Sequence, residues 1–466
     1  MHETEPEPAL RGRRIRLTHG RTVGGSSAVN GMVYVRGFPT DYAQWRQLGA
    51  EGWSYDGVLP YFRKAERYAA GADDYHGGDG PVGVEGTAWR NPLADAFIAA
   101  AEQVGVPRVD DLAGASFEGV GYHDLTTWKG RRSSTWDTYI EPNRGRPNLH
   151  ILAGALVHRV DLEDGRAVGV TYEREGEIVS VRASGEVILS AGALRSPQLL
   201  QLSGIGSGAL LAAHGIPVVH DLPGVGENLM DHLAVNRGYE TGSRHTVNAM
   251  MASRLAMLGA GASYFLRRQG PMTMGAALAG GFARTRPELD VPDVQIAFTP
   301  FLGDTQTGGL SKKSGFMLVT YQLRPESRGH VRIASPDPRT DASILLNSLE
   351  ADADKRTLVA GMRMLRRIAE AQPLRQLGAT EVTPGLTGGA DDDGALLERA
   401  IATSGSAYHY SGTARIGTVV DSALRVSGIE RLRVIDASVM PTVTSGNTNA
   451  ASIMIGEKGA DLVKAG

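Results

Sequence analysis

Two short segments near the carboxyl end hold the residues best suited to chemistry. His409 lies in SAYHYSGTARIG (406–417), among small and polar residues typical of a loop, and Asn447 lies in SGNTNAAS (445–452). An imidazole changes its protonation near neutral pH, so a histidine in a loop can move a proton. A structural histidine followed by turn-forming asparagines would give the same pattern. The residues alone leave both interpretations open.

A second segment of interest is the glycine-rich stretch GRTVGGSSAVNGMVYVRG (20–37), where Gly24 and Gly25 precede Ser26 and Ser27. Glycine has no side chain, so backbone N–H groups there can approach an anion or a flat ring system closely. An ordinary glycine turn that leads into a helix is the alternative, and composition does not separate the two.

One apparent nucleotide motif does not have the right context. In GIGSGALLAAHG (204–215), Gly204, Gly206 and Ala209 match the pattern G-x-G-x-x-A, and Asp221 follows near the distance expected of a ribose-binding acid. The pattern requires a strand directly before its first glycine, and the preceding QLLQLS is typical of a helix. We therefore interpret this segment as a turn between helices.

Several other kinds of chemistry find no support. The 12 histidines form neither H-E-x-x-H nor a close cluster with acids, so no metal site is expected. Asp231 and His232 stand together after GVGENL, and we interpret them as structural. The chain has no G-x-S-x-G elbow, no phosphate-binding P-loop and no cysteine, which argues against a serine hydrolase, a P-loop enzyme and thiolate or disulfide sites.

Composition narrows the class of protein. The 466 residues include 48 Lys and Arg against 51 Asp and Glu, and the resulting net charge of −3 predicts no footprint for nucleic acid or an anionic membrane. No apolar run is long enough to span a bilayer, and the start MHETEPEPALRGRR does not resemble a secretory signal. The absence of cysteine fits a reducing compartment, so we expect a cytoplasmic protein.

The hydrophobic pattern mixes strands and helices. Residues 151–162 and 167–175 predict a hairpin, and 184–204 predict a strand, a tight turn and a helix with Ser196 as N-cap and Pro197 at its first position. Strands are expected at 294–300, 316–323 and 329–335, and apolar residues at helical spacing predict a helix over about 350–371. This order favours an α/β or α+β fold with two lobes.

Taken together, these segments resemble the glucose–methanol–choline (GMC) oxidoreductases, most closely the choline and alcohol dehydrogenase branch. The order and spacing match from about residue 3 to the end. The segments that carry the resemblance are TEPEP (4–8), GRTVGGSSAVNGMVYVRG (20–37), SAGALRSPQLLQLSGIG (190–206), LPGVGENLMDH (222–232), PESRGHVRIASPDP (325–338), YHYSGT (408–413) and LRVIDASVMPTVTSGNTNAASIMIGEKGADL (432–462).

The resemblance implies an α/β plus α+β fold, in which a Rossmann-type FAD-binding domain (1–232 and 405–466) accompanies a substrate domain (233–404) built on an antiparallel sheet. It also implies non-covalent FAD, because the position at which some relatives carry a flavin-linked histidine is Val29 here. The implied cofactor-binding residues are Gly24, Gly25, Ser26, Asn30, Val157, Ser190, Ala191, Gly192, Asp436, Ala437, Asn447 and Thr448.

The implied reaction is oxidation of a small alcohol to an aldehyde or ketone. By resemblance, His409 takes the hydroxyl proton, Asn447 donates a hydrogen bond to the developing alkoxide, and the hydride goes to flavin N5. The electron acceptor and the particular alcohol are not readable. Met250, Met251, Met257, Met272 and Met274 lie in or near the expected substrate lobe, where they could line an apolar pocket but are better explained as core filling.

The sequence departs from the family at its start. Relatives begin with a βαβ unit that carries G-x-G-x-x-G, whereas only Met1 to Leu17 precede the glycine-rich stretch here, and such a unit needs ~30 residues. We therefore expect an incomplete Rossmann sheet with unpaired edges and a half-open cofactor pocket. A trimmed start, a second chain that supplies the missing unit, and a retained fragment with a non-redox, lyase-type or silent binding role are the three explanations.

Overall fold

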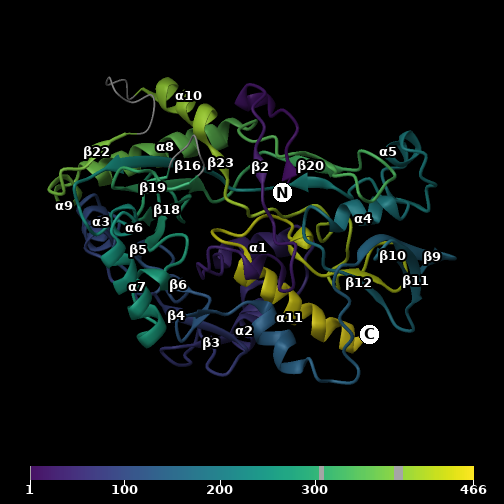
Figure 1. The fold of residues 1–466 in the computed structure, drawn as a ribbon. Coiled ribbons are helices and arrows are strands. Elements are labelled where there is room, and N and C mark those ends of the chain that lie inside the picture. The colour runs from purple at the N-terminus through teal and green to yellow at the C-terminus, as the bar shows by residue number, and fades with distance from the viewer. Residues whose placement is uncertain (1, 304–308, 383–391) are drawn as a thin grey trace.

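The strands expected around residues 294–323 lie in a seven-stranded antiparallel sheet. The structure is a computed structural model that describes residues 2–303, 309–382 and 392–466 (Figure 1). The strand order is β22-β16-β19-β18-β17-β5, and β23 also pairs with β16. The strands are β5 (Gly119–Tyr122), β16 (Leu233–Glu240), β17 (Ala279–Ala283), β18 (Val294–Thr299), β19 (Gly315–Gln322), β22 (Thr380–Glu381) and β23 (Gly405–Ser406). The expected antiparallel sheet is confirmed.

Alternation along the central strands gives this sheet two different faces. In β18, Ile296 and Phe298 are buried in one cluster with residues of α3 (Pro92–Gln103) and α8 (Asp352–Glu370), so these two helices cover one face. Gln295 pairs with Tyr321 of β19, and Tyr321 packs instead against residues of the segment that follows the glycine-rich stretch. The second face therefore combines polar side chains with a lining from the other lobe.

The other lobe contains a short parallel pair. Strand β12 (Val187–Leu189) lies beside β24 (Leu432–Val434), which joins segments that are far apart in the sequence. The helix α11 (Asn449–Ala465) packs against α2 (Tyr55–Ala65), and both contribute to the same core as β12 and β24. Among the described residues, β24 is the only strand paired with β12.

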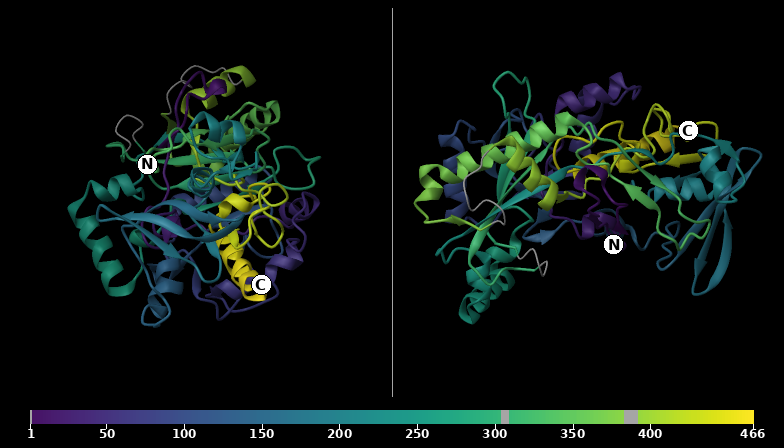
Figure 2. Two further views of the ribbon diagram at one scale, coloured as in Figure 1. Left: turned by 90° about the vertical axis from the view of Figure 1, so that its right-hand side faces the viewer. Right: turned by 90° about the horizontal axis from the view of Figure 1, so that it is seen from above.

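The expected hairpin is present as β9 (Leu156–Glu163) and β10 (Arg166–Arg174), and β11 (Glu177–Arg182) adds a third strand that the sequence analysis did not predict. Asp164 and Gly165 both have positive φ, as the tight hairpin turn between these strands requires. The three strands project at one end of the molecule, opposite α7 (Arg254–Arg267), as Figures 1 and 2 show.

The expected strand and helix at 184–204 are also present, with one correction. Helix α4 (Ser196–Leu202) has Arg195 at its N-cap, so Ser196 is the first helical residue and Pro197 the second. The Ser196 hydroxyl does not cap the helix, because it donates to Asp436 at 2.5 Å and accepts from the Ala191 N–H. It therefore links two loops at the site described below.

The segment with the rejected nucleotide motif folds as expected into a connection between helices. Helix α5 (Gly208–Ala213) follows the two-residue strand β13 (Ile205–Gly206), which pairs with β14 (His220–Asp221). The Asp221 carboxylate accepts the N–H of Gly208 at 2.8 Å, so it holds the start of α5. The role of Asp221 is local.

The remaining elements are short or peripheral. The expected strand at 329–335 is β20 (Gly329–Arg332), which lies between β15 (Glu227–Leu229) and β21 (Ser343–Leu345) in a separate sheet. The others are β1 (His2–Glu3), β2 (Arg16–Leu17), β3 (Glu66–Tyr68), β4 (Val82–Gly86), β6 (Asp124–Leu125), β7 (Thr127–Trp128), β8 (Arg131–Arg132), α1 (Pro39–Gln47), α6 (Val247–Met251), α9 (Gln372–Arg375) and α10 (Asp393–Thr403).

A buried ionic cluster fixes the segment that leaves the glycine-rich stretch. Arg36 donates to Glu66 at 2.6 Å, and His76 lies 3.1 Å from Glu66 and 3.2 Å from Asp111. The side chains of Arg36, Glu66 and His76 are almost completely inaccessible to solvent. Although burial lowers the pKa of His76, hydrogen bonds to Asp111 and Glu66 raise it overall to about 9.

We predict that His76→Phe lowers the free energy of unfolding by about 3 kcal/mol, because Glu66 and Asp111 lose a buried cationic partner. The folded-state pKa of His76 lies above its ordinary value of 6.5. The stabilisation is therefore complete below pH 6.5 and is lost as the pH rises through about 9. Urea unfolding at about pH 6 and about pH 10 should show this loss in the unchanged chain and not in the variant. The exposed His150→Phe is the control, and an equal pH response in both variants would refute the assignment.

Candidate functional site

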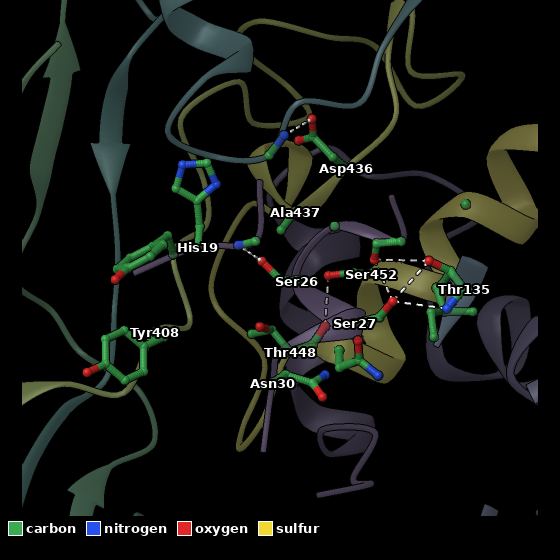
Figure 3. A pocket seen from close by; sticks show the side chains of 18 of the residues that line it. His19, Ser26, Ser27, Asn30, Thr135, Tyr408, Asp436, Ala437, Thr448 and Ser452 are labelled. Atoms are coloured by element: carbon green, nitrogen blue, oxygen red, sulfur yellow. Dashed lines mark hydrogen bonds between the residues drawn. The ribbon is translucent and has the colours of Figure 1, made fainter. Parts of the chain in front are cut away.

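A cavity of about 1130 Å³ lies where three distant segments of the chain meet. Residues 19–33 form one wall, residues 190–194 another, and residues 436–460 a third, with 135–140 and 407–410 completing the lining. Figure 3 shows side chains of these segments pointing toward a common space. The cavity is therefore a product of the tertiary fold, not of one local motif.

Almost all the predicted site residues line this cavity. The lining includes Gly24, Gly25, Ser26, Asn30, Ser190, Ala191, Gly192, His409, Asp436, Ala437, Asn447 and Thr448. Val157 is not among the lining residues, since it lies on β9 opposite Tyr172. The lining also includes residues that the sequence analysis missed, such as His19, Arg21, Thr135 and Tyr408.

The glycine-rich wall depends on backbone conformations that glycine adopts readily. Gly24 has φ 83° and Gly25 has φ 54°, and they open a single turn of 3-10 helix, Gly25–Ala28. A β-carbon on Gly24 would lie 3.1 Å from that of Trp136, so the chain there approaches its neighbour closely. The Ser27 hydroxyl donates to the Gly24 carbonyl at 2.6 Å and lies 3.0 Å from the Thr135 hydroxyl, which fixes the turn.

Asp436 joins two other walls of the cavity. One carboxylate oxygen accepts the Gly192 N–H at 2.9 Å and the Ser196 hydroxyl at 2.5 Å. The second accepts the N–H and the hydroxyl of Ser438. Figure 3 shows Asp436 with one of its hydrogen bonds as a dashed line. Both carboxylate oxygens of Asp436 accept hydrogen bonds from the protein itself. Asp436 therefore influences a bound ligand indirectly, because it holds the 190–196 loop in place.

The lining fits a large, extended cofactor that carries oxygen atoms with negative charge. Helix α11 begins at the cavity, its cap residue Thr448 makes no side-chain capping bond, and residues along its first turns line the space. The N–H groups at a helix start attract such oxygens. Gly25 and Gly192 have open space where a β-carbon would lie, so a flat group can approach the backbone there. FAD has this combination of a flat ring and phosphates.

His409 and Asn447 meet at one end of this lining. The Asn447 amide nitrogen lies 3.0 Å from Nε2 of His409, and the His409 backbone N–H donates to Asp231 at 2.7 Å. His409 is 7% exposed. Burial, aided by the neighbouring His232, lowers the pKa of His409 well below its ordinary value, so its imidazole is neutral at pH 7.

His232 determines which nitrogen of His409 is free. The Leu323 carbonyl can only accept, so Nε2 of His232, at 3.0 Å, must carry the hydrogen. Burial lowers the pKa of His232 to about 4, so its ring is neutral and its Nδ1 is an acceptor. Nδ1 of His409, at 2.8 Å, then donates to it. The lone pair of His409 is left on Nε2, beside Asn447.

The sequence interpretation of Asp231 and His232 as merely structural was incomplete. Both lie directly before β16, at the point where the two lobes meet, and both are bonded to His409. Asp231 also accepts from the Ser406 hydroxyl, and burial raises the pKa of this carboxyl to about 7. No local motif marks an Asp-His pair for such a role, because its partner is 177 residues away.

Two kinds of feature are absent from the part of the chain that the structure describes. No group of three or more histidine and acidic side chains in this part of the chain is arranged to hold a metal ion. No helix within the described ranges combines the length and apolar character needed to cross a bilayer.

The fold and the cavity define a cofactor-dependent enzyme: an extended, glycine-lined space ends at a buried neutral histidine with an asparagine amide on its free nitrogen. Comparison with protein families agrees. Models described as GMC oxidoreductase match residues 7–234 and 325–456. The chain belongs to the GMC oxidoreductase family.

Individual relatives share most of the chain. The chain is 42% identical over 473 residues to an oxygen-dependent choline dehydrogenase of Escherichia coli O17:K52:H18, an alignment that covers 99% of this chain and 84% of the relative. A protein of the same name from Pseudomonas putida KT2440 is 42% identical over 476 residues, covering 99% of this chain and 83% of the relative.

Solved structures show the same fold. Pyridoxine 4-oxidase from Mesorbium loti has a TM-score of 0.88 at 28% identity, covering 99% of this chain and 87% of its own. An FAD-dependent oxidoreductase from Chaetomium thermophilum has a TM-score of 0.90 at 27% identity, covering 100% and 89%. The expected family and enzyme class are confirmed, and matches along nearly the whole chain favour the enzyme over a subunit or a silent binding protein.

We predict that Asp436→Ala lowers the free energy of unfolding by about 3 kcal/mol, because four donors on Gly192, Ser196 and Ser438 lose their acceptor. It should also weaken cofactor binding, since the 190–196 loop is no longer held. Urea unfolding and cofactor titration measure the two effects. Ser438→Ala removes one of the four bonds and should have a smaller effect on both, and equal effects would contradict the proposed linking role.

Proposed function

We propose that this protein is an FAD-dependent oxidoreductase that converts an alcohol to an aldehyde or ketone. The observation that supports this most is the free Nε2 of His409 beside the Asn447 amide, at one end of a lining that suits FAD. FAD, when bound, accepts the hydride at its N5 atom. The remaining steps belong to side chains of the chain itself.

Gly24, Gly25, Ser26 and Asn30 would bind FAD from one side, with Ser190, Ala191, Gly192, Asp436 and Ala437 opposite and Thr448 at the start of α11. The residue that could form a covalent link in relatives is Val29 here, which has no nucleophile, so binding is non-covalent. The pair β12–β24 would be part of the Rossmann-type sheet of the FAD-binding domain. Val157 would contact the adenine side.

In the reaction, His409 would accept the hydroxyl proton at Nε2. An alcohol releases hydride far more readily as its alkoxide, so a base at this atom lowers the barrier. His232 keeps that nitrogen unprotonated through the bond at Nδ1. The Asn447 amide, 3.0 Å from the same nitrogen, would donate to the alkoxide oxygen as its charge grows. Gln295 donates to the other side of that amide at 3.4 Å and so sets its orientation.

The cavity wall near His409 favours an uncharged alcohol. The cavity that contains His409 is also lined by Met32, Val33, Ala276 and Ala407, together with Tyr408. The carboxylates among the lining residues are Asp436 and Glu457. Asp436 is hydrogen-bonded as described above, and Glu457 accepts the Tyr139 hydroxyl at 2.6 Å and lies 3.1 Å from the Lys64 ammonium. A quaternary ammonium group would find no free carboxylate there.

The test of the function is the visible spectrum of the purified 466-residue chain after incubation with FAD and desalting, followed by anaerobic mixing with alcohols. We expect retained flavin bands that bleach with alcohol. His409→Ala should keep FAD yet slow the bleaching by about 10²–10⁴-fold, since the base is lost. Because the pKa of His409 is lowered, activity of the unchanged chain should fall on the acid side only well below pH 6.5.

The control for this test is Tyr410→Phe, which changes a neighbouring buried residue without touching either nitrogen of His409. Near-normal bleaching in His409→Ala would show that another group is the base. A folded chain that binds no FAD would refute the proposed function.

We also predict that uncharged primary alcohols have a kcat/KM at least about tenfold above that of choline, because no free carboxylate meets a cation near His409. Ala276→Asp places a carboxylate on an exposed part of the cavity wall and should shift the ratio toward choline. Ala276→Asn is the matched uncharged control. A preference for choline in the unchanged chain would overturn this substrate class.

A further inference from the structure

An apolar helical arm stands out from the body of the molecule. The α6–α7 arm comprises residues 247–273, with α6, α7 and the 3-10 turn Pro271–Thr273. Leu255 is 82% exposed, Leu258 71%, Phe265 71% and Leu266 82%, and Met251, Met257 and Met272 are each about half exposed. The expectation that the methionines of this region fill a core is wrong for these three.

The arm is only weakly packed against the rest of the chain. In α7 only Ala260 is buried, and residues 251–259 are exposed without interruption. The main contacts of α7 are with α6 and with the turn at 271–273, which belong to the same arm. Figures 1 and 2 show α7 at the edge of the molecule. A helix of this length is marginal in water, and an apolar patch of this kind marks an interaction surface.

The charged side chains of the chain segment that contains the arm all have one sign, and two of them, Arg284 and Arg286, are paired with Glu118 and Glu288 outside it. Residues 241–287 contain six arginines and no aspartate or glutamate, although the whole chain carries a net charge of only −3. Arg254, Arg267 and Arg268 lie within or directly after α7. The loop with Lys129 and Arg131 lies against Arg268 through Gly130. Glu85 accepts the N–H groups of residues 129 and 130 in this loop.

We infer that the α6–α7 arm docks on an anionic lipid surface. Leucine, methionine and phenylalanine side chains exposed beside arginines and without acids are typical of helices that lie in the bilayer interface. The 14 residues of α7 are too few to span a bilayer, which needs ~20, so the helix would lie in the plane of the interface. The arginines would reach the phosphates while their stems stay among apolar groups.

A second copy of the chain fits this surface less well. In a two-fold contact between two copies of the arm, each would present the same arginines and no acid, so like charges would meet. An anionic bilayer supplies both the opposite charge and the apolar layer. The sequence analysis predicted no binding to an anionic membrane because the net charge of the whole chain is close to zero. That sum hides the local excess of arginine over acidic residues in this segment.

Docking would also orient the cavity. The arm leads directly into Ala276, which lines the cavity and whose N–H donates to the Gly31 carbonyl at 2.9 Å. The bilayer would therefore lie near the part of the cavity wall that Gly31 and Ala276 form. This inference does not depend on the proposed function, because it concerns the arm alone.

The experiment is co-sedimentation of the FAD-incubated full chain with vesicles of phosphatidylcholine plus phosphatidylglycerol, and with vesicles of phosphatidylcholine alone. We expect binding to the anionic vesicles that weakens with added salt. Leu255→Asp combined with Leu258→Asp, and separately Arg267→Ser combined with Arg268→Ser, should each lower the bound-to-free ratio at least about tenfold. These side chains are exposed, so far-UV circular dichroism and FAD retention should be unchanged.

The matched control is Ile178→Asp on β11, an exposed apolar residue (67%) at the opposite end of the molecule, which should bind vesicles like the unchanged chain. Equal binding to both kinds of vesicle, or no loss in either double variant, would overturn the inference. Sedimentation velocity tests the alternative of a second copy. If the unchanged chain is a dimer, the Leu255→Asp, Leu258→Asp double variant is a monomer and neither binds vesicles, the apolar face contacts a second copy and the inference of lipid docking is overturned.

Discussion

The short hydrogen bond between the two imidazoles is the interaction on which the site depends. His232 comes from the start of β16 and His409 from the segment after β23, so the bond of 2.8 Å holds the meeting point of the two lobes. Its direction is set from outside the site, because the Leu323 carbonyl at the end of β19 can only accept. The backbone of the antiparallel sheet thus decides which nitrogen of His409 can take a proton. Low exposure keeps both rings neutral, which makes this order of donors possible.

The same site shows how a fold with few local signals can build a cofactor lining. Gly24 and Gly25 supply a turn, Gly192 an open loop, and α11 the start of a helix, yet none of these segments is near the others in sequence. Asp436 joins the Gly192 loop to its own segment through four hydrogen bonds, two of them local ones to Ser438. Because all its hydrogen bonds go to the protein, the Asp436 carboxylate contributes to ligand binding by shaping the cavity wall and does not offer a free charge.

Much of the fold was predictable from the sequence, because the short apolar runs at 294–299 and 316–322 and the helical spacing in 352–370 are typical of the strands and the helix found there. Nearly every site residue that the resemblance implied lines the cavity, although other lining residues, such as His19 and Thr135, were not implied. What the sequence could not show was pairing at long range. Ser196 has the identity expected of an N-cap, but it is the first residue of α4 and its hydroxyl donates to Asp436. Asp231 and His232 carry no motif, and only the fold brings them to His409. Val157 remains a prediction, since the cavity as described does not reach it.

The methionines of the α6–α7 arm illustrate a different limit. A run of apolar residues at helical spacing predicts a helix, and on average such a face is buried. In α7 only Ala260 is buried and the main contacts are with the rest of the arm, so little of the free energy that normally comes from burial is gained on folding. A helix with so little tertiary support persists in a protein only when its exposed residues serve another contact. The charge of the arm indicates the kind of partner. Because the segment carries arginines and no aspartate or glutamate, a second copy of the arm would repel it, whereas a negatively charged surface would attract it.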